Sequence, residues 1–216
     1  MKKKSQVYFS VCMIIAFAVW TILVNYVDVK TIGPNGTQVG FATLNIFMHR
    51  LTGVNMSLYN MTDWLGLVPF FFACGFGILG LIQWIKRKHI LKVDFNILIL
   101  GGFYIVTIAV YLFFELVVIN YRPILINGVL EASYPSSTTM LTMCVIPTAI
   151  IQFNIRIKNT ATRNVTSLIL TAFTVFMVVA RFISGVHWFT DIIGGIMFSI
   201  GLVALYSCFV NFKKEK

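Results

Sequence analysis

The sequence has 216 residues, of which 58% are hydrophobic, 15% are aromatic and only 11% are charged. About a quarter of the residues of a soluble globular domain are charged, and a soluble fold of this length has too little interior to hide so much apolar surface. The composition therefore excludes a soluble domain and predicts an integral membrane protein, in which the formal net charge of +10 has to be interpreted by the position of the basic residues.

Six apolar segments follow one another along the chain. They cover residues 7–24, 64–85, 95–119, 136–153, 165–183 and 188–210. Each is about long enough to cross a hydrocarbon core of ~30 Å at 1.5 Å per residue, and lipid requires internally bonded backbone, so we expect an all-α bundle of six transmembrane helices. The first follows three lysines as a signal peptide would, but its apolar stretch is too long and no A-x-A site follows, which favours a retained helix.

Six spans place both ends of the chain on one side of the membrane, and the basic residues indicate which side. Thirteen of the 17 fall on the side of the termini: Lys2, Lys3, Lys4, Lys86, Arg87, Lys88, Lys92, Arg156, Lys158, Arg163, Lys213, Lys214 and Lys216. The other four are Lys30, Arg50, Arg122 and Arg181. Cytoplasmic loops are enriched in Lys and Arg, so we expect cytoplasmic termini in a multi-pass plasma-membrane protein, with no nucleic-acid partner.

The first outer connection, residues 25–63, is long for a six-helix bundle. It begins with a turn-rich stretch and carries apolar residues on a helical period over 41–51, which predicts a short helix lying in the membrane interface. We expect residues 1–216 to form a single membrane domain. The four cysteines all lie in apolar runs without C-x-x-C spacing, so we expect no disulfide, metal site or cofactor.

Polar residues gather where the predicted helices reach the outer face. They are Arg122, Ser136, Ser137, Thr138, Arg181, His187 and Asp191. Arginine forks suit phosphate, and a helix N-terminus favours anions. His187 and Asp191 are four residues apart and would share one face of a helix, where a carboxylate that holds one imidazole nitrogen leaves the other as a nucleophile. The set predicts phosphoryl transfer through a phosphohistidine.

The sequence resembles the type 2 phosphatidic acid phosphatases, relatives of the vanadium-dependent haloperoxidases. That family has three motifs, K-x6-R-P, P-S-G-H and S-R-x5-H-x3-D. Here the third reads A-R-F-I-S-G-V-H-W-F-T-D over residues 180–191, the second reads P-S-S-T over 135–138, and the first reads E-x6-R-P from Glu115. The resemblance extends from about residue 64 to the end of the chain, so 64–216 is expected to be a phosphatase-like core with an outward-facing site.

The resemblance also implies roles for individual residues. It implies two catalytic residues, His187 as nucleophile and Asp191 as its orienting partner. It implies four phosphate-binding residues, which are Arg122, Arg181, Ser136 and Ser137. The family's lysine is replaced by Glu115, and its acid histidine by Thr138, whose hydroxyl is a poor acid near pH 7.

The same residues have structural interpretations. The histidine and aspartate could cap a helix, Arg122 could extend to the interface, and residues 136–138 could be only an N-cap. For Glu115 we favour an ion pair with an arginine over a protonated carboxyl that replaces the missing acid. His49 is expected to contact lipid headgroups, and the alternative is that it folds over the site as a substitute acid.

Two functions remain open. The first is a lipid phosphatase that hydrolyses a lipid phosphate or polyprenyl pyrophosphate at the extracytoplasmic face, with membrane lipids as partners and substrate. The second is a catalytically degenerate family member that binds or moves anionic lipids. A retained His–Asp pair favours the enzyme because a binder has no use for it, whereas loss of the lysine and the acid favours the binder. A haloperoxidase is disfavoured because nothing else in the sequence supports vanadate binding.

Overall fold

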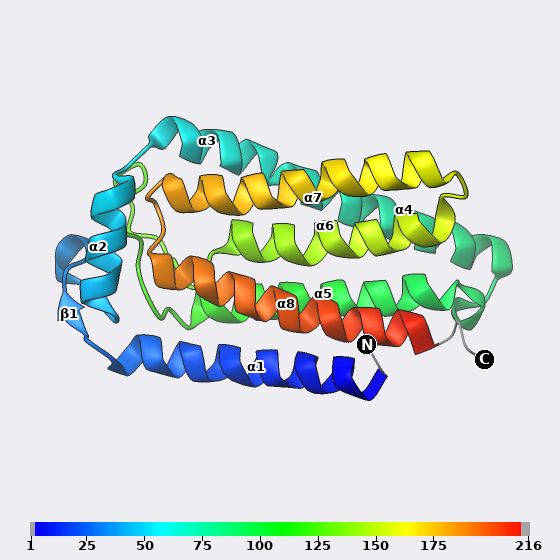
Figure 1. The fold of residues 1–216 in the computed structure, drawn as a ribbon, viewed down its shortest axis with the longest axis horizontal. Coiled ribbons are helices and arrows are strands. Elements are labelled where there is room, and N and C mark those ends of the chain that lie inside the picture. Colours follow the sequence, from blue (N-terminus) through cyan, green and yellow to red (C-terminus); the bar gives the residue numbers. More distant parts are fainter. Residues whose placement is uncertain (1–2, 213–216) are drawn as a thin grey trace.

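The structure, a computed structural model, describes residues 3–212 and is a bundle of helices aligned with one long axis (Figure 1). Within these residues, six helices are long and apolar enough to cross a membrane. They are α1 (Lys3–Tyr26), α4 (Leu67–Arg87), α5 (Phe95–Leu116), α6 (Ser137–Arg156), α7 (Thr160–Ile183) and α8 (Phe189–Phe212). The predicted six-helix membrane architecture is confirmed, and the helix boundaries differ from the predicted ones by a few residues.

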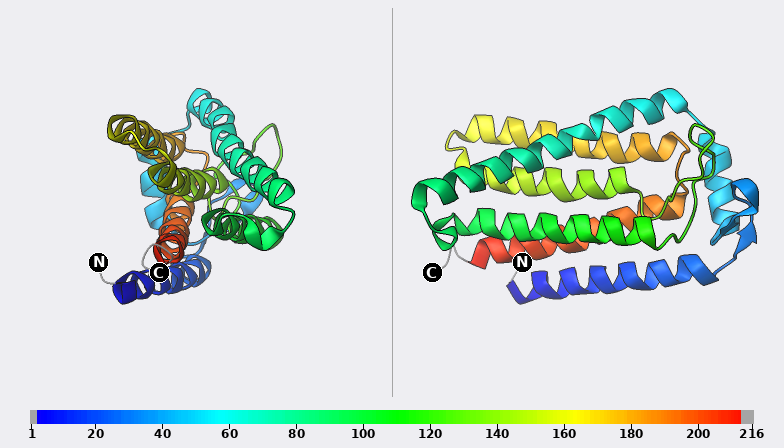
Figure 2. Two further views of the ribbon diagram at one scale, coloured as in Figure 1. Left: turned by 90° about the vertical axis from the view of Figure 1, so that its right-hand side faces the viewer. Right: turned by 180° about the vertical axis from the view of Figure 1, so that it is seen from behind.

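Two of the helices form the interior of the bundle. Half of the residues in the apolar stretches of α6 and α8 are buried, whereas the other spanning helices turn most of their side chains outward. α8 packs against α1 and α6, as the end view in Figure 2 shows. A side chain at Gly194 of α8 would come within 2.7 Å of the Tyr134 ring. The glycine therefore allows α8 to approach the segment that leads into α6, where the second motif lies.

The outer segment is folded rather than open. It contains a short hairpin of β1 (Lys30–Thr31) and β2 (Gln38–Val39), with the 3-10 turn η1 (Pro34–Gly36) between them, and then α2 (Ala42–Thr52) and α3 (Met56–Leu65). α2 covers nearly the same residues as the helix predicted over 41–51. α3 was not predicted, and it begins where the Asn55 side chain accepts a hydrogen bond from the Leu58 amide at 2.9 Å. The remaining short element is η2 (Ile90–Lys92), between α4 and α5.

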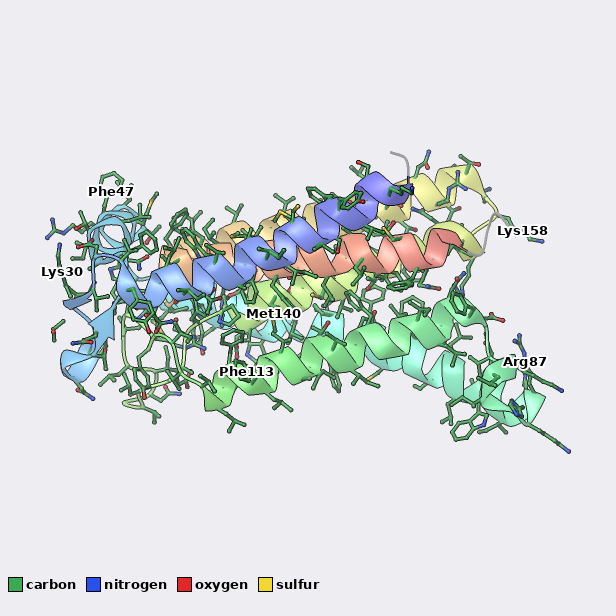
Figure 3. The ribbon with its side chains drawn as sticks, turned by 90° about the horizontal axis from the view of Figure 1, so that it is seen from below. Lys30, Phe47, Arg87, Phe113, Met140 and Lys158 are labelled. Carbon is green, nitrogen blue, oxygen red and sulfur yellow. The ribbon has the colours of Figure 1, made fainter. Side chains whose placement is uncertain are left out.

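The connections divide between the two ends of the bundle. β1, α2 and the α5–α6 and α7–α8 connections lie at one end, and the first residues of α1 and the last of α8 point to the other (Figures 1 and 2). Figure 3 shows Lys30 at the former end and Arg87 and Lys158 at the latter. Of the basic residues assigned to the cytoplasm, Lys2, Lys213, Lys214 and Lys216 lie outside the described residues. The orientation in the membrane stays a prediction.

The α5–α6 connection corrects one sequence expectation. α5 ends at Leu116, so Arg122 does not close the third spanning helix as predicted. Arg122 instead lies in an extended strand-like segment, where its amide donates to the Glu131 carbonyl at 3.1 Å and the Ser133 amide donates to the Asn120 carbonyl at 2.9 Å. The proline after Arg122 explains the error, because a residue before proline is pushed out of the helical region.

Cysteine labelling tests the predicted orientation. In a background in which the exposed Cys12 and Cys74 are replaced by alanine, we expect a membrane-impermeant thiol reagent to label Val129→Cys in intact cells and Lys158→Cys only after permeabilisation. Both positions are exposed and lie at opposite ends of the bundle. Val129 is chosen rather than Asn127 because Asn127 has a positive φ, which a cysteine would adopt less readily. Labelling in the reverse order would place the motif residues in the cytoplasm.

Candidate active site at the outer end of the bundle

A tight turn between α7 and α8 carries His187. Gly185 in this turn has φ +66°, and a Cβ there would lie 1.8 Å from the Gly53 carbonyl oxygen, so only glycine fits. The Ser184 carbonyl accepts from the Asn55 amide at 2.9 Å, and Nε2 of His49 lies 3.1 Å from the Gly185 carbonyl. The α2–α3 junction therefore holds the turn in place by backbone contact.

The imidazole of His187 is held through one nitrogen. Its Nδ1 lies 3.1 Å from the carbonyl oxygen of Ser133 and 3.0 Å from the hydroxyl oxygen of the same residue. A carbonyl can only accept, so Nδ1 carries the ring proton and Nε2 presents a lone pair. Nε2 is buried and has no hydrogen-bond partner within residues 3–212. This nitrogen is thus the one whose lone pair is free of protein partners among the described residues.

Burial and nearby positive charges keep the imidazole ring of His187 neutral. Burial lowers the pKa of His187 well below its usual value, and the nearby positive charges of Arg122 and Arg181 lower it further. A histidine with a lowered pKa is unprotonated at neutral pH, so its free nitrogen remains nucleophilic there.

Asp191 is fixed by several donors but does not touch the imidazole. Its Oδ2 accepts from the Ser133 hydroxyl at 2.5 Å and from the Trp188 amide at 3.0 Å, and its Oδ1 accepts from the Asn120 amide group at 3.1 Å. Oδ2 lies 4.0 Å from Nδ1 of His187. The expectation of one shared helix face is wrong, because α8 begins two residues after the histidine.

Arg181 is the most completely buried cation of the site, with 1% of its surface exposed. Its Nη1 donates to the Thr62 hydroxyl at 3.1 Å, and its Nη2 lies 3.7 Å from Oδ1 of Asp63. The guanidinium carbon lies 4.7 Å from the centre of the Tyr59 ring, in cation–π contact. All three partners come from α3, so the outer segment is part of this site.

Arg122 approaches the same Tyr59 ring from the α5–α6 connection, at 5.7 Å. Its Nε lies 3.0 Å from Oε2 of Glu131, an ion pair without the angle of a hydrogen bond. The favoured ion pair between Glu115 and an arginine is therefore wrong for Arg122. Its partner is the residue opposite it in the extended segment, and within the described residues Glu115 forms no ion pair with any arginine.

The second motif contributes buried hydroxyls at the start of α6. Ser136 is the N-cap residue, but its Oγ forms no cap and is buried without a hydrogen-bond partner among the described residues. Its amide donates to the backbone carbonyl of Asp191 at 3.1 Å, so it is not free for an anion as expected. Ser137 lines a small cavity of about 10 Å³ together with His187 and Glu115.

Unpartnered buried polar atoms therefore gather at one end of the bundle. Within residues 3–212 they include Nη1 of Arg122, Nε of Arg181, Oγ of Ser136 and Nε2 of His187, whereas Nε of Arg122 has its ion pair with Glu131. Buried polar groups in native proteins are normally hydrogen bonded, so a group of atoms without partners marks a candidate binding site. Three of these atoms can donate hydrogen bonds and Nε2 of His187 presents a lone pair, which suits a tetrahedral anion with an electrophilic centre.

The three residues considered as substitute acids lie in different surroundings. His49 contacts the Gly185 carbonyl and packs against the Trp188 ring at 5.6 Å, so it supports the turn before the nucleophile. Thr138 is half-buried in the first turn of α6 and is not part of the cavity wall. Glu115 is exposed and lines the cavity that His187 also lines.

Several residues of the site were missed by sequence reasoning. They are Tyr59, Thr62, Asp63, Asn120, Glu131 and Ser133. Only Ser133 had a local signal, since it stands two residues before the second motif. The others lie in the long outer connections, where nothing in the sequence indicates which polar residues turn inward.

These features define a membrane-spanning helical fold that gathers arginines, a histidine and hydroxyl groups at one end of the bundle, and comparison with known proteins places this fold. The model of the PAP2 superfamily matches residues 71–215, so the chain belongs to the PAP2 superfamily. A search of curated proteins found no match. A solved structure described as the first transmembrane PAP2-type phosphatidylglycerolphosphate phosphatase from Bacillus subtilis is similar in fold, with a TM-score of 0.61 and 18% identity over 97% of this chain and 98% of that one.

Binding of inorganic phosphate tests the anion site. We expect Arg122→Lys and Arg181→Lys each to weaken phosphate binding about 10-fold or more in detergent, because lysine lacks the planar fork and charged hydrogen bonds contribute about 1.5–3 kcal/mol. Calorimetric titration measures the affinity, and Arg50→Lys, at an exposed position of α2, serves as the control. Unchanged affinity in both site variants would show that the arginines do not bind phosphate.

Proposed function

We propose that the protein is a plasma-membrane lipid phosphatase that hydrolyses a lipid phosphate or polyprenyl pyrophosphate at the extracytoplasmic face. PAP2 superfamily membership and fold support lipid phosphatase activity in general. The observation that carries the specific mechanism is the unpartnered Nε2 of His187 among unpartnered atoms of Arg122, Arg181 and Ser136. A nucleophile placed among anion-binding donors favours phosphoryl transfer through a phosphohistidine.

The reaction proceeds in two steps that balance. In the first, the Nε2 lone pair of His187 forms a bond to phosphorus, and the bond from phosphorus to the leaving oxygen breaks with its electron pair on that oxygen. In the second, water attacks phosphorus, loses a proton and displaces Nε2, which releases phosphate and restores the neutral imidazole. Arg122, Arg181, Ser136 and Ser137 hold the phosphoryl oxygens through both steps, and the water-derived proton balances the charge on the leaving oxygen.

A family member that only binds or moves anionic lipids remains the second candidate, because Glu115 and Thr138 replace the family's lysine and acid histidine. A binder requires the arginines but not the nucleophile. The two functions therefore differ in the variant that abolishes them, since His187→Ala eliminates turnover in the enzyme and leaves lipid binding unchanged in the binder.

The nucleophile is tested by turnover and by trapping. We expect His187→Ala to abolish phosphate release, and Asp191→Asn to lower it severely, because the ring loses the charge that stabilises its cationic form. Substrate labelled at the transferred phosphate should leave an alkali-stable label on wild-type protein and none on His187→Ala. His89→Ala, at an exposed position outside the candidate site, is the control and should retain full turnover. Wild-type turnover in His187→Ala would end the phosphohistidine mechanism.

The missing acid predicts the preferred substrate. A phosphate monoester of a lipid expels a basic alkoxide, whereas a lipid pyrophosphate expels a phosphate monoester whose second pKa is about 6 and which departs without a proton. General acid catalysis contributes about 10²–10⁴-fold, so a site without an acid histidine loses more on monoesters. We expect faster hydrolysis of a polyprenyl pyrophosphate than of a phosphatidate, measured as phosphate release from each in mixed micelles.

Substitution at Thr138 provides the matched test of this preference. We expect Thr138→His to raise monoester turnover more than pyrophosphate turnover, while Thr138→Asn, a polar side chain without an acidic group, raises neither. Equal or faster monoester hydrolysis by the native protein would contradict the preference and would identify Glu115, on the cavity wall beside His187, as the substitute acid.

A further inference from the structure

The nucleophile and its acidic partner are separated by one side chain. Nδ1 of His187 and Oδ2 of Asp191 are 4.0 Å apart, beyond the range of a hydrogen bond. The Ser133 hydroxyl lies between them, 3.0 Å from the nitrogen and 2.5 Å from the carboxylate oxygen. All three side chains are buried, so water does not compete for these contacts.

The direction of each hydrogen bond follows from the chemistry of the groups. A carboxylate only accepts, so the single hydroxyl proton of Ser133 is donated to Asp191. The serine oxygen then has lone pairs left for Nδ1–H of His187, which also faces the Ser133 carbonyl at 3.1 Å. The result is an ordered chain from ring nitrogen to hydroxyl to carboxylate, in which each bond polarises the next.

The serine is itself held on both sides. Its amide donates to the Asn120 carbonyl at 2.9 Å, and the Asn120 side chain donates to the other carboxylate oxygen of Asp191 at 3.1 Å. The following residue, Tyr134, bonds through its hydroxyl to Thr21 of α1 at 2.7 Å. Ser133 is therefore fixed by its backbone and by its neighbour, which gives it one orientation between the neutral imidazole and the carboxylate.

We propose that Ser133 is a positioning residue that couples Asp191 to His187, so that the nucleophile, the serine and the aspartate act as one unit. This inference rests on the proposed function. When Nε2 bonds to phosphorus the ring becomes cationic, and the negative charge of Asp191 stabilises it through the polarised hydroxyl. The serine undergoes no covalent change, and no proton has to leave it.

The test is a double-mutant cycle on phosphate release. We expect Ser133→Ala to lower kcat about 10- to 100-fold, by analogy with the cost of removing a partner that orients a metal-binding histidine, with KM changed less. Because the aspartate acts through the serine, adding Asp191→Asn to Ser133→Ala should cost much less than Asp191→Asn costs alone. Ser133→Thr, which returns the hydroxyl, should recover most of the lost kcat.

Two further variants separate positioning from folding. Ser199→Ala removes another buried serine hydroxyl, one that donates to the Met140 carbonyl between α8 and α6 at 3.2 Å, and it should leave kcat unchanged. If Ser133→Ala unfolds at a lower temperature in detergent, Ser133→Cys keeps the volume with a poor donor and should still lower kcat.

The outcomes distinguish this proposal from the proposed function. Wild-type kcat in Ser133→Ala or Ser133→Cys, with a severe loss in Asp191→Asn, would overturn the coupling and leave the phosphohistidine mechanism intact. Fully multiplicative losses in the double variant would also overturn it, since the two residues would then act independently. Turnover in His187→Ala would instead remove the proposed function on which the inference rests.

Discussion

Arg122 and Arg181 carry two positive charges into one buried site, where water solvates them poorly and their mutual repulsion is weakly screened. The end of the bundle that holds this site is organised around this constraint. The Tyr59 ring and the carboxylates of Asp63 and Glu131 offset part of this positive charge. Tyr59 and Asp63 come from α3, and Glu131 comes from the α5–α6 connection. Nη1 of Arg122 and Nε of Arg181 form no hydrogen bond within the described residues, so both nitrogens remain as hydrogen-bond donors within the site.

A second organising feature is the close approach of α8 to the residues that precede α6. Small residues on α8 allow the chain around Tyr134 to lie directly against the helix, and this contact places the Asp191 carboxylate beside Ser133 and Asn120. The site is thus built on the ends of the most buried helices, and the loops that complete it are bonded to those ends. Rigid support of this kind keeps a nucleophile in one orientation.

The fold was predictable because lipid imposes a simple rule on sequence: apolar stretches of about twenty residues become helices. All six spanning helices begin or end within a few residues of the predicted bounds. The motif spacing also indicated which arginines, histidine and aspartate belong near one another. The partners of these residues were not predictable. Glu131 faces Arg122 through backbone pairing in an irregular connection, and Ser133 comes between His187 and Asp191 because α8 begins later than the i,i+4 pattern assumed.

The backbone contact between Gly185 and Gly53 joins the nucleophile's turn to a part of the chain that precedes the family-matched region, residues 71–215. α3, which also precedes the family-matched region, supplies the groups around Arg181. A chimaera that exchanges the α7–α8 turn would therefore keep these contacts only if residues 53–63 were exchanged with it.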